Sequence, residues 1–407
     1  MEFEKLSEIA TVTPGTSPKG EQINSSGKGF PFFQGSKEFK ELFPVVERYT
    51  EFPVKLAKQG DILISVRAPV GEVNLALQDC AIGRGVMSVR AKTPVEKMYI
   101  FYFLKNLQGR WDSLGSTGSV FENLSTVALN SLKIPKDINR AAVGDVLFNL
   151  DKKIATNNAL SKTLEDIAQT IFKSWFINFD PVKAKMNGEK PIGMDDETAA
   201  LFPDSLEESE LGLIPKGWSA GKFGDSSNLL MGQSPPGDSY NSDGVGLPFY
   251  QGRTDFGFRF PKRRIFCTQE NRVAQAGETL ISVRAPVGDI NQAIEKCIIG
   301  RGVASVMHKS GSEAYSYSLL KSLYPVLSYY NGEGTVFGAI NRNDFHNLLI
   351  VEPSQKVVKA YDRVCSPIND EVRTLHLCTE TLIGVRDSLL PRLISGELQI
   401  PEEMLAS

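Results

Sequence analysis

A repeated octapeptide contains an arginine whose side chain could bind a phosphate or a base. The octapeptide Ile-Ser-Val-Arg-Ala-Pro-Val-Gly occurs at 64–71 and again at 281–288, so Arg67 and Arg284 occupy equivalent positions. A guanidinium group is a planar fork of donors that binds phosphate or the O6 and N7 atoms of guanine. The alternative is structural, with each arginine satisfying loop carbonyls beside a glycine turn.

Two further shared motifs carry side chains of the same kind. A Gly-Arg-Gly motif contains Arg84 and Arg301, and a Pro-Phe-aromatic-Gln-Gly turn contains Gln34 and Gln251. A glutamine amide can form two hydrogen bonds with adenine, or it can cap a loop. These residues are candidate nucleic-acid contacts, with a scaffold role as the alternative.

The segment after each Gln-Gly turn differs between the copies, so it is the best candidate for any difference in what they bind. The candidates are Ser36, Lys37 and Lys40 in the first copy, and Arg253, Thr254, Arg259, Lys262, Arg263 and Arg264 in the second. The second set includes the most basic stretch of the chain. A solvated charged loop would have the same composition.

Small polar turns near the end of each copy are a second candidate, because they allow close approach to a phosphate backbone. Their candidate residues are Ser116, Thr117 and Ser119 in the first copy, and Asn331 and Thr335 in the second.

The motifs belong to two copies of one module. A single offset of 217 residues aligns them, and it extends to Gly15-x-Ser-Pro18 and Gly232-x-Ser-Pro235. A length of 407 residues suits two to four domains. The repeat therefore predicts a function with two related halves, either bipartite or two-fold symmetric.

Each copy is predicted to be a mixed α/β (α+β) domain. Apolar runs between turn residues predict strands at 62–66 and 86–89, with equivalents at 280–283 and 303–306. A helix is expected in each copy, at 98–114 and 314–330.

A different pattern follows each module. Apolar residues from 143 to 175 alternate in steps of four and three, and the same steps recur from 357 to 389. This period of 3.5 residues is typical of a coiled coil, and Asn157 and Glu371 are the equivalent polar positions. Ser366-Pro367 predicts that the second helix restarts there. The residues expected to pair the helices are Leu147, Leu150, Ile154, Asn157, Leu164, Ile171, Ile368, Glu371, Leu375, Leu382 and Leu389.

These patterns divide the chain into five parts, and the two helices are expected to pair antiparallel, giving pseudo-two-fold symmetry with side faces left for partners. The predicted parts are a first repeated module at 1–140, a central long helix at 141–179, a linker at 180–212, a second repeated module at 213–353 and a C-terminal long helix at 354–400.

Charge is distributed unevenly along the chain. Residues 1–140 and 216–350 each carry three more basic than acidic groups, whereas 180–215 carries six more acidic groups. This balance permits DNA binding by the repeats without requiring it. The five cysteines form no CxxC pair, and neither a membrane-spanning run nor a signal peptide is evident. A reducing cytoplasm is the expected compartment.

Catalytic motifs are missing from the sequence. It contains no phosphate-binding GxxxxGK[ST] loop and no Asn/Asp-Pro-Pro-aromatic motif of an adenine methyltransferase. The three histidines lack metal-ligand spacing. We therefore expect a non-catalytic chain without a metal.

The order of module, heptad helix, module and heptad helix resembles the specificity subunit of type I restriction–modification systems. The motifs Gly-Asp-Ile-Leu-Ile-Ser-Val-Arg-Ala-Pro-Val-Gly at 60–71 and Gly-x-Ile-Pro-x-Gly-Trp at 212–218 carry the resemblance. It implies that each target recognition domain reads half of a split site in double-stranded DNA. The helices would set the gap and dock two modification subunits, which methylate adenine with S-adenosylmethionine, and restriction subunits would complete the complex.

Two departures from the family pattern accompany the resemblance. The first module lacks the Ile-Pro-x-Gly-Trp opening, and the two modules are unusually alike. Their likeness predicts half-sites related, at least in part, as inverted repeats. Two alternatives stay open here: an architectural coiled-coil adaptor that does not read DNA, and a fragment of a self-contained modification–restriction enzyme.

Overall fold

The computed structural model describes the chain except for residues 1, 109–110, 112–123, 137, 332–337 and 402–407. The chain forms two compact units, Met1–Ala159 with Leu377–Ser407, and Leu160–His376. We call them unit 1 and unit 2. Each contains one repeated module and part of both long helices, and each is described separately. Among the described residues, no helix combines the length and apolarity needed to cross a membrane.

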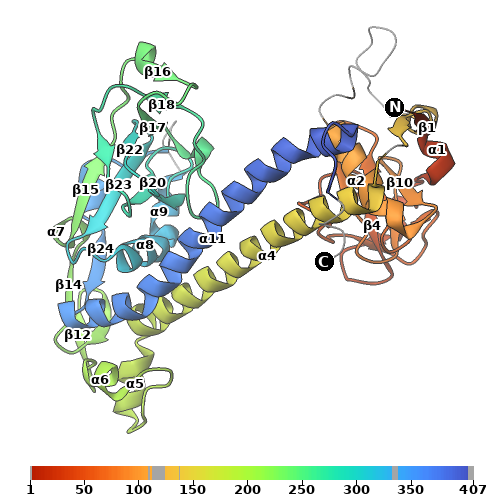
Figure 1. The fold of residues 1–407 in the computed structure, drawn as a ribbon. Helices are drawn as coiled ribbons and strands as arrows, with labels where there is room; N and C mark the ends of the chain where they lie inside the picture. The colour runs from red at the N-terminus through yellow and green to blue at the C-terminus, as the bar shows by residue number, and fades with distance from the viewer. Residues whose placement is uncertain (1, 109–110, 112–123, 137, 332–337, 402–407) are drawn as a thin grey trace. The chain divides into compact units, whose positions relative to one another are not determined.

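The module of unit 1 contains three small sheets (Figure 1). One is antiparallel, with the order β2 (Ala10–Pro14), β10 (Val86–Ala91), β7 (Ile62–Ser65) and β8 (Val73–Leu75). The second has the order β3 (Ile23–Asn24), β5 (Tyr49–Thr50), β4 (Phe30–Phe33), β9 (Cys80–Ile82) and β6 (Leu56–Ala57). The third pairs β1 (Phe3–Lys5) with β11 (Lys133–Pro135), and the helices are α1 (Leu6–Ile9), α2 (Lys97–Asn106) and α3 (Thr126–Asn130).

The module of unit 2 repeats this topology strand by strand. Its first sheet has the order β15 (Ser227–Met231), β23 (Val303–His308), β20 (Thr279–Ser282) and β21 (Ile290–Gln292). The second has the order β16 (Tyr240–Asn241), β18 (Phe266–Cys267), β17 (Leu247–Tyr250), β22 (Cys297–Ile299) and β19 (Val273–Ala274). The third pairs β14 (Ser219–Lys222) with β24 (Leu349–Glu352), and the helices are α7 (Phe223–Ser226), α8 (Glu313–Ser322), α9 (Tyr324–Ser328) and α10 (Arg342–His346).

Pair registers also repeat at the offset of 217 residues. Val86 pairs with Ser65 in unit 1, and Val303 pairs with Ser282 in unit 2. The predicted mixed α/β modules are therefore confirmed. The helix expected at 314–330 is wrong as one element, because it breaks at Leu323, where Pro325 lies in the first turn of a new helix. The helix expected at 98–114 ends at Asn106.

Both predicted long helices are present, as α4 (Arg140–Phe172, extended by a π-turn at Lys173–Ile177) and α11 (Gln355–Ser395). The predicted restart at Ser366-Pro367 is wrong, since α11 continues through both residues. Pro367 is exposed and removes one backbone N–H, while Cys365 before it is buried in the core of unit 2. Tertiary packing thus holds the helix together across the missing hydrogen bond.

Contacts within each unit show that the helices pair antiparallel. In unit 2 the Tyr361 hydroxyl on α11 donates to the backbone carbonyl of Ala168 on α4, at 3.2 Å. In unit 1 the Asn157 amide on α4 donates to the hydroxyl of Thr379 on α11, at 3.3 Å. The early part of each helix therefore pairs with the late part of the other. The α4 residues expected in the seam are buried or half-buried, namely Leu147, Leu150, Ile154, Asn157, Leu164 and Ile171.

Of the ten positions that steps of four and three place in the seam of α11 from 357 to 389, four are wrong. Ile368, Leu375, Leu382 and Leu389 are buried or half-buried, but Val364, Glu371, Cys378 and Val385 are exposed. The buried face keeps Val357 and Tyr361 but passes through Cys365, Val372 and Thr379, each one position beyond an exposed predicted residue. From Tyr361 to Leu382 the buried and half-buried residues still alternate in steps of four and three, so the heptad period holds while alternate positions shift by one residue. Asn369 and Thr379, not Glu371, are buried polar residues of this helix, at 8% and 5% exposure.

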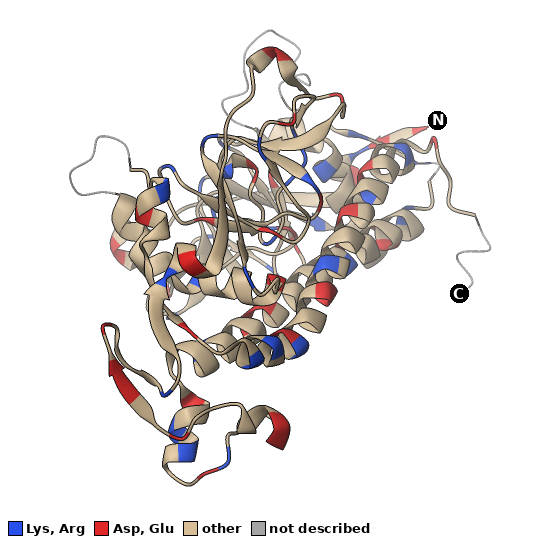
Figure 2. Cartoon of the chain, turned by 90° about the vertical axis from the view of Figure 1, so that its left-hand side faces the viewer, with Lys and Arg blue, Asp and Glu red and all other residues tan. Residues whose placement is uncertain are grey.

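The segment expected to be a linker is folded. It forms α5 (Asp180–Met186), α6 (Asp196–Ala200) and a hairpin of β12 (Leu206–Ser209) and β13 (Gly212–Pro215). Val182, Phe202 and Trp218 are buried in one cluster with Trp175 and Phe176. The Asp and Glu residues of this segment are exposed, and Figure 2 marks acidic positions in red on the lower part of the drawing. A few apolar anchors thus fix a segment whose composition resembles a linker.

Candidate nucleic-acid interface

Parallel strand pairing brings the repeated motifs together in each module. β4 pairs parallel with β9, and β17 pairs parallel with β22, so the Gln-Gly and Gly-Arg-Gly turns leave the same sheet edge. In unit 2 the Gly302 N–H donates to the Gln251 carbonyl at 3.0 Å. A Cβ on Gly302 would lie 2.6 Å from that oxygen, and one on Gly85 would lie 2.2 Å from the Gln34 oxygen. Only glycine permits this approach.

The octapeptide turn lies beside these two turns. The Val66 N–H donates to Gly85 O, and the Val283 N–H donates to Gly302 O, both at 2.9 Å. Inside the turn, Ser65 and Ser282 donate to the carbonyls of Pro69 and Pro286, at 2.6 and 2.8 Å. Both Ala-Pro bonds, 68–69 and 285–286, are cis. Most of the octapeptide is therefore scaffold.

The four repeated arginines point to solvent instead of supporting these turns. Arg67, Arg84, Arg284 and Arg301 are all exposed. The backbone N–H groups of Arg84 and Arg301 donate to Ser17 and Ser234, at 3.1 and 3.2 Å, which fixes the base of each side chain. Guanidinium groups held at an exposed turn are suited to bind phosphate oxygens or base edges.

In unit 2 these turns enclose a pocket of about 320 Å³. Its lining consists of Gln251, Gly252, Arg253, Thr254, Arg284, Ala285, Arg301 and Gly302. Five residues predicted as nucleic-acid contacts therefore meet in one place, three of them arginines. Positive charge beside amide and hydroxyl groups suits a polyanion whose bases also present donors and acceptors.

The same lining is encoded in unit 1. The equivalents are Gln34, Gly35, Ser36, Lys37, Arg67, Ala68, Arg84 and Gly85, which match the unit 2 lining at six of eight positions. The strand pairings that assemble the turns are also the same. Each module thus presents one version of a common surface.

One predicted contact, Arg259, is corrected by its burial. Its side chain is 3% exposed and pairs with Glu165 on α4 at 2.6 Å, and Glu165 is also 3% exposed. Its guanidinium carbon lies 3.3 Å from the ring centroid of Tyr317. An arginine enclosed in this way cannot reach a DNA surface, and it fixes the loop to the spacer helix.

The other basic residues of the differing loops are exposed, and most have acidic partners. Arg264 binds Asp255 at 2.6 Å, which raises the pKa of the Arg264 guanidinium above its ordinary value. Arg263 pairs with Glu295, and Lys37 pairs with Glu47 at 3.2 Å. Lys40 and Lys262 are also exposed. These acidic partners reduce the net positive electrostatic potential of the basic stretch.

The second candidate region is only partly within the described chain. Asn331 uses its amide to accept from the Val287 N–H and to donate to the Val287 carbonyl, so it supports the octapeptide turn. Ser116, Thr117, Ser119 and Thr335 lie outside the described residues.

Asp289 was not predicted, although it directly follows the octapeptide and touches a lining residue. Its carboxylate forms an ion pair with Arg253. The signal was present in the sequence, because Glu72 follows the first octapeptide at the equivalent position. An acid that follows the octapeptide in both copies can orient a neighbouring guanidinium, as Asp289 does for Arg253 in unit 2.

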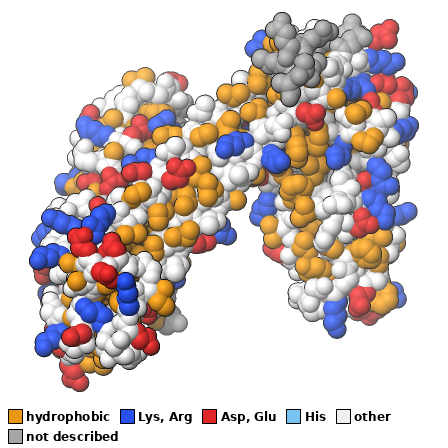
Figure 3. All heavy atoms as spheres, turned by 60° about the horizontal axis from the view of Figure 1, so that its bottom comes forward, with side chains coloured by type: hydrophobic (Ala, Val, Ile, Leu, Met, Phe, Trp, Pro, Cys, Tyr) orange, Lys and Arg blue, Asp and Glu red, His pale blue; other side chains and the backbone are white. Residues whose placement is uncertain are grey.

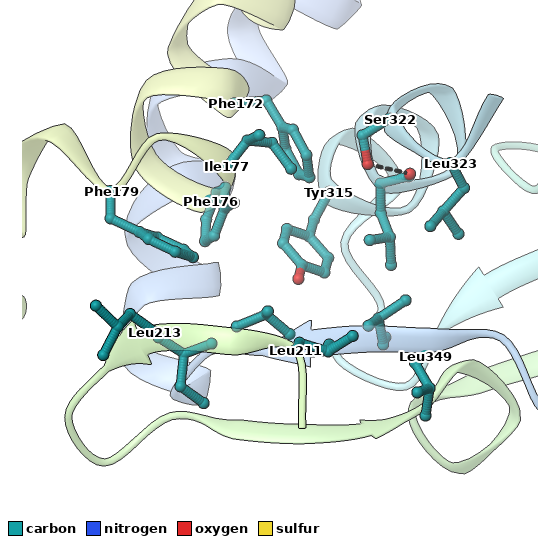
Figure 4. Close-up of a pocket in the computed structure, with 14 residues that line it drawn as sticks. Phe172, Phe176, Ile177, Phe179, Leu211, Leu213, Tyr315, Ser322, Leu323 and Leu349 are labelled. Carbon is teal, nitrogen blue, oxygen red and sulfur yellow. Dashed lines mark hydrogen bonds between the residues drawn. The ribbon is translucent and has the colours of Figure 1, made fainter. Parts of the chain in front are cut away.

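Two other surfaces are apolar rather than basic. Leu160, Ile167, Val364, Leu377 and Val385 are exposed by 40–47% on the long helices, and Figure 3 shows hydrophobic side chains on the helix surface. In unit 2, an apolar pocket of about 300 Å³ lies between the end of α4 and the β12–β13 hairpin. Figure 4 shows Phe176 and Phe179 facing Leu211 and Leu213 across it. Such surfaces suit protein partners.

Comparisons with known proteins agree with this architecture. The family model described as type I restriction modification DNA specificity domain matches residues 1–166. The putative type I restriction enzyme MjaX specificity subunit of Methanocaldococcus jannaschii is 27% identical over 320 residues, covering 76% of this chain and 70% of its own. The MjaIX specificity subunit of the same organism is 23% identical over 429 residues, covering 98% and 94%.

A third relative and a solved structure extend the pattern. The HindI specificity subunit of Haemophilus influenzae is 23% identical over 335 residues, covering 68% of this chain and 70% of its own. The crystal structure of the type I restriction–modification S subunit from M. genitalium has the same fold, with a TM-score of 0.62, 16% identity and coverage of 97% and 96%. With its repeated modules and paired long helices, this chain is similar to the specificity subunits of type I restriction–modification systems.

Proposed function

We propose that each module reads one half of a bipartite sequence in double-stranded DNA, through the arginine-lined surface where its motif turns meet. The observation that carries this proposal is the repetition of that surface, with Arg67, Arg84, Arg284 and Arg301 exposed at equivalent turns. Phosphate contacts would position each module, and base contacts would provide specificity.

The long helices set the gap between the half-sites and carry the catalytic partners. Two modification subunits dock on the exposed apolar side chains of α4 and α11, which include Ile167 and Val385. These subunits bind S-adenosylmethionine and methylate adenine, and restriction subunits complete the complex. This chain supplies specificity and no catalysis. All five cysteines carry free thiols, which supports a reducing cytoplasm as its compartment.

The half-sites are related in part as inverted repeats. Six of eight pocket positions are identical between the modules, so most of the bases that they read are the same. The modules belong to two helices that run in opposite directions, and duplex DNA has an approximate two-fold axis between its strands. Two unrelated half-sites would contradict this relation.

Selection from a random duplex library tests the proposal. The chain would be purified together with its modification subunits and used to retain DNA at about 150 mM salt, with the bound duplexes sequenced. We expect one split motif with a fixed gap, and affinity that falls as salt rises. If the intact complex enriches no sequence, the DNA-reading proposal fails and the architectural adaptor is favoured.

A further inference from the structure

The two reading surfaces differ at only two lining positions, so any difference in what they read is concentrated there. Ser36 in unit 1 corresponds to Arg253 in unit 2, and Lys37 corresponds to Thr254. The remaining six residues are identical. Shared residues cannot distinguish one half-site from the other.

Arg253 is an oriented arginine rather than a freely moving one. Its guanidinium pairs with Asp289, and the two side chains are 52% and 33% exposed. The Asp289 backbone N–H donates to the Ser282 hydroxyl at 2.9 Å, which anchors the carboxylate at the start of β21. Asp289 holds one nitrogen of the fork, and Arg253 is one of the residues that line the pocket, so its other donors are left for a ligand.

Unit 1 has the same acid without the arginine. The Glu72 N–H donates to the Ser65 hydroxyl at 2.9 Å, the same anchor as in unit 2. Ser36 carries an uncharged hydroxyl, so it cannot neutralise the Glu72 carboxylate. Lys37 pairs with Glu47 instead, and its side chain is 80% exposed. Unit 1 therefore presents the Glu72 carboxylate, a hydrogen-bond acceptor, where unit 2 presents the guanidinium donors of Arg253.

We propose that Arg253, positioned by Asp289, reads a guanine in the half-site of unit 2. At the corresponding base pair, Glu72 of unit 1 accepts a hydrogen bond from cytosine N4 or adenine N6. The chemistry follows from the major-groove patterns, where guanine offers two acceptors to an arginine fork and cytosine offers an amine to a carboxylate. This inference rests on the proposed reading of DNA by the modules, and it assigns the difference between the half-sites to one position.

The test is a reciprocal exchange in the full chain, expressed with its partner subunits and read by mapping methyladenine genome-wide. The variant Ser36→Arg with Lys37→Thr makes the first lining identical to the second. We expect guanine to be gained at one position of the first half-site, with the second half-site unchanged. The change in preference should be about tenfold to a hundredfold. Arg253→Ser with Thr254→Lys should relax the second half-site at that position alone.

Two further variants sharpen the test. Asp289→Asn keeps the shape but removes the charge that orients Arg253, so guanine preference should weaken at that position while the rest of the motif persists. Arg272→Ser is the matched control, because Arg272 is an exposed arginine of unit 2 outside the lining. It should leave both half-sites intact.

The outcomes separate this inference from the proposed function. If the wild-type chain yields no split motif, the proposed function fails. If the motif is present but both exchanges leave every base preference unchanged, or alter the wrong half-site, the assignment to Arg253 is overturned. If both exchanges abolish methylation, the base preference of each variant is measured instead by library selection with the purified complexes. Enrichment of a motif without the expected change of base would also overturn the assignment to Arg253.

Discussion

Both modules are tied to α4 by a buried carboxylate and a lysine, but the third member of each cluster differs. In unit 1 Asp151 binds Lys105 at 2.9 Å and Arg386 of α11 at 2.6 Å. In unit 2 Glu165 binds Lys321 of α8 and Arg259 of the differing loop, both at 2.6 Å. The loop is therefore part of the cluster only in unit 2.

The backbone at this point of the loop is nevertheless the same in both units. The Leu75 N–H donates to Leu42 O, and the Gln292 N–H donates to Arg259 O, both at 2.8 Å. Leu42 and Arg259 are thus equivalent and both are buried, one in an apolar core and the other in an ion pair. The comparison teaches that a common scaffold accepts opposite side-chain chemistry provided that each buried group has a suitable partner.

The largest effect is expected from breaking the cluster of unit 2. Arg259→Leu places the unit 1 type of residue there and leaves Glu165 with Lys321 alone. Loss of a buried partner should lower the free energy of unfolding of unit 2 by about 3 kcal/mol. Urea unfolding followed by fluorescence of Trp175 and Trp218, which are buried in unit 2, measures it.

The double variant Arg259→Leu with Glu165→Gln is the control, because it removes the unpaired charge together with its partner. It should recover a large part of the lost stability. An unchanged unfolding midpoint for Arg259→Leu would show that the ion pair does not hold the loop.

The next largest effect tests the likeness of the two reading surfaces. Arg67→Ala and Arg284→Ala remove equivalent exposed arginines. Each should weaken binding to the complete site by about 1–3 kcal/mol, and by similar amounts, because the surrounding turns are the same. Titration of labelled duplex with the purified complex measures both. A large loss from one variant and none from the other would contradict equivalent roles.

Acid should destabilise unit 1 through Asp151. Burial alone would raise the pKa of Asp151, but Lys105 and Arg386 outweigh burial and lower it from the ordinary 3.8. The stabilisation is therefore complete above the unfolded pKa and is lost as pH falls through the lower folded pKa. Unfolding followed by Trp111 fluorescence from pH 6 downward tests this. Arg386→Gln should shift the acid transition to higher pH, and an identical transition would refute the assigned role.

The smallest effect should come from the exposed basic stretch. Arg263 and Arg264 already have acidic partners, and only Lys262 adds unopposed charge. Replacing all three by alanine should reduce the salt dependence of DNA binding by about one phosphate equivalent, with the recognised sequence unchanged. A changed motif would move part of the reading surface to this loop.

The repeat made most of the fold predictable from sequence. Shared motifs at one offset predicted equivalent strands, and apolar periodicity located both long helices. The seam of α11 was misassigned because Val364 and Val385 are apolar yet exposed, so period alone could not separate a buried face from a face left for partners. The folded segment at 180–212 was missed because its buried apolar anchors, Val182 and Phe202, are widely spaced in an acid-rich stretch.

The candidate site was predictable to the extent that its residues were repeated. In unit 2 the shared residues Gln251, Arg284 and Arg301 meet at one pocket because parallel strands place both turns at the same edge. Arg259 could not be assigned from sequence, since its partner Glu165 lies 94 positions away. A basic residue within a basic stretch of sequence is expected to be exposed. Arg259 is buried because of its tertiary contact with Glu165.

A genome-wide map of methyladenine, made in the host with and without this chain, tests the central claim most directly. We predict a split motif that disappears when the chain is deleted and whose half-sites share most positions as inverted repeats. A map that is unchanged by the deletion, in cells where the modification subunits are active, would contradict the assignment of sequence specificity to this chain.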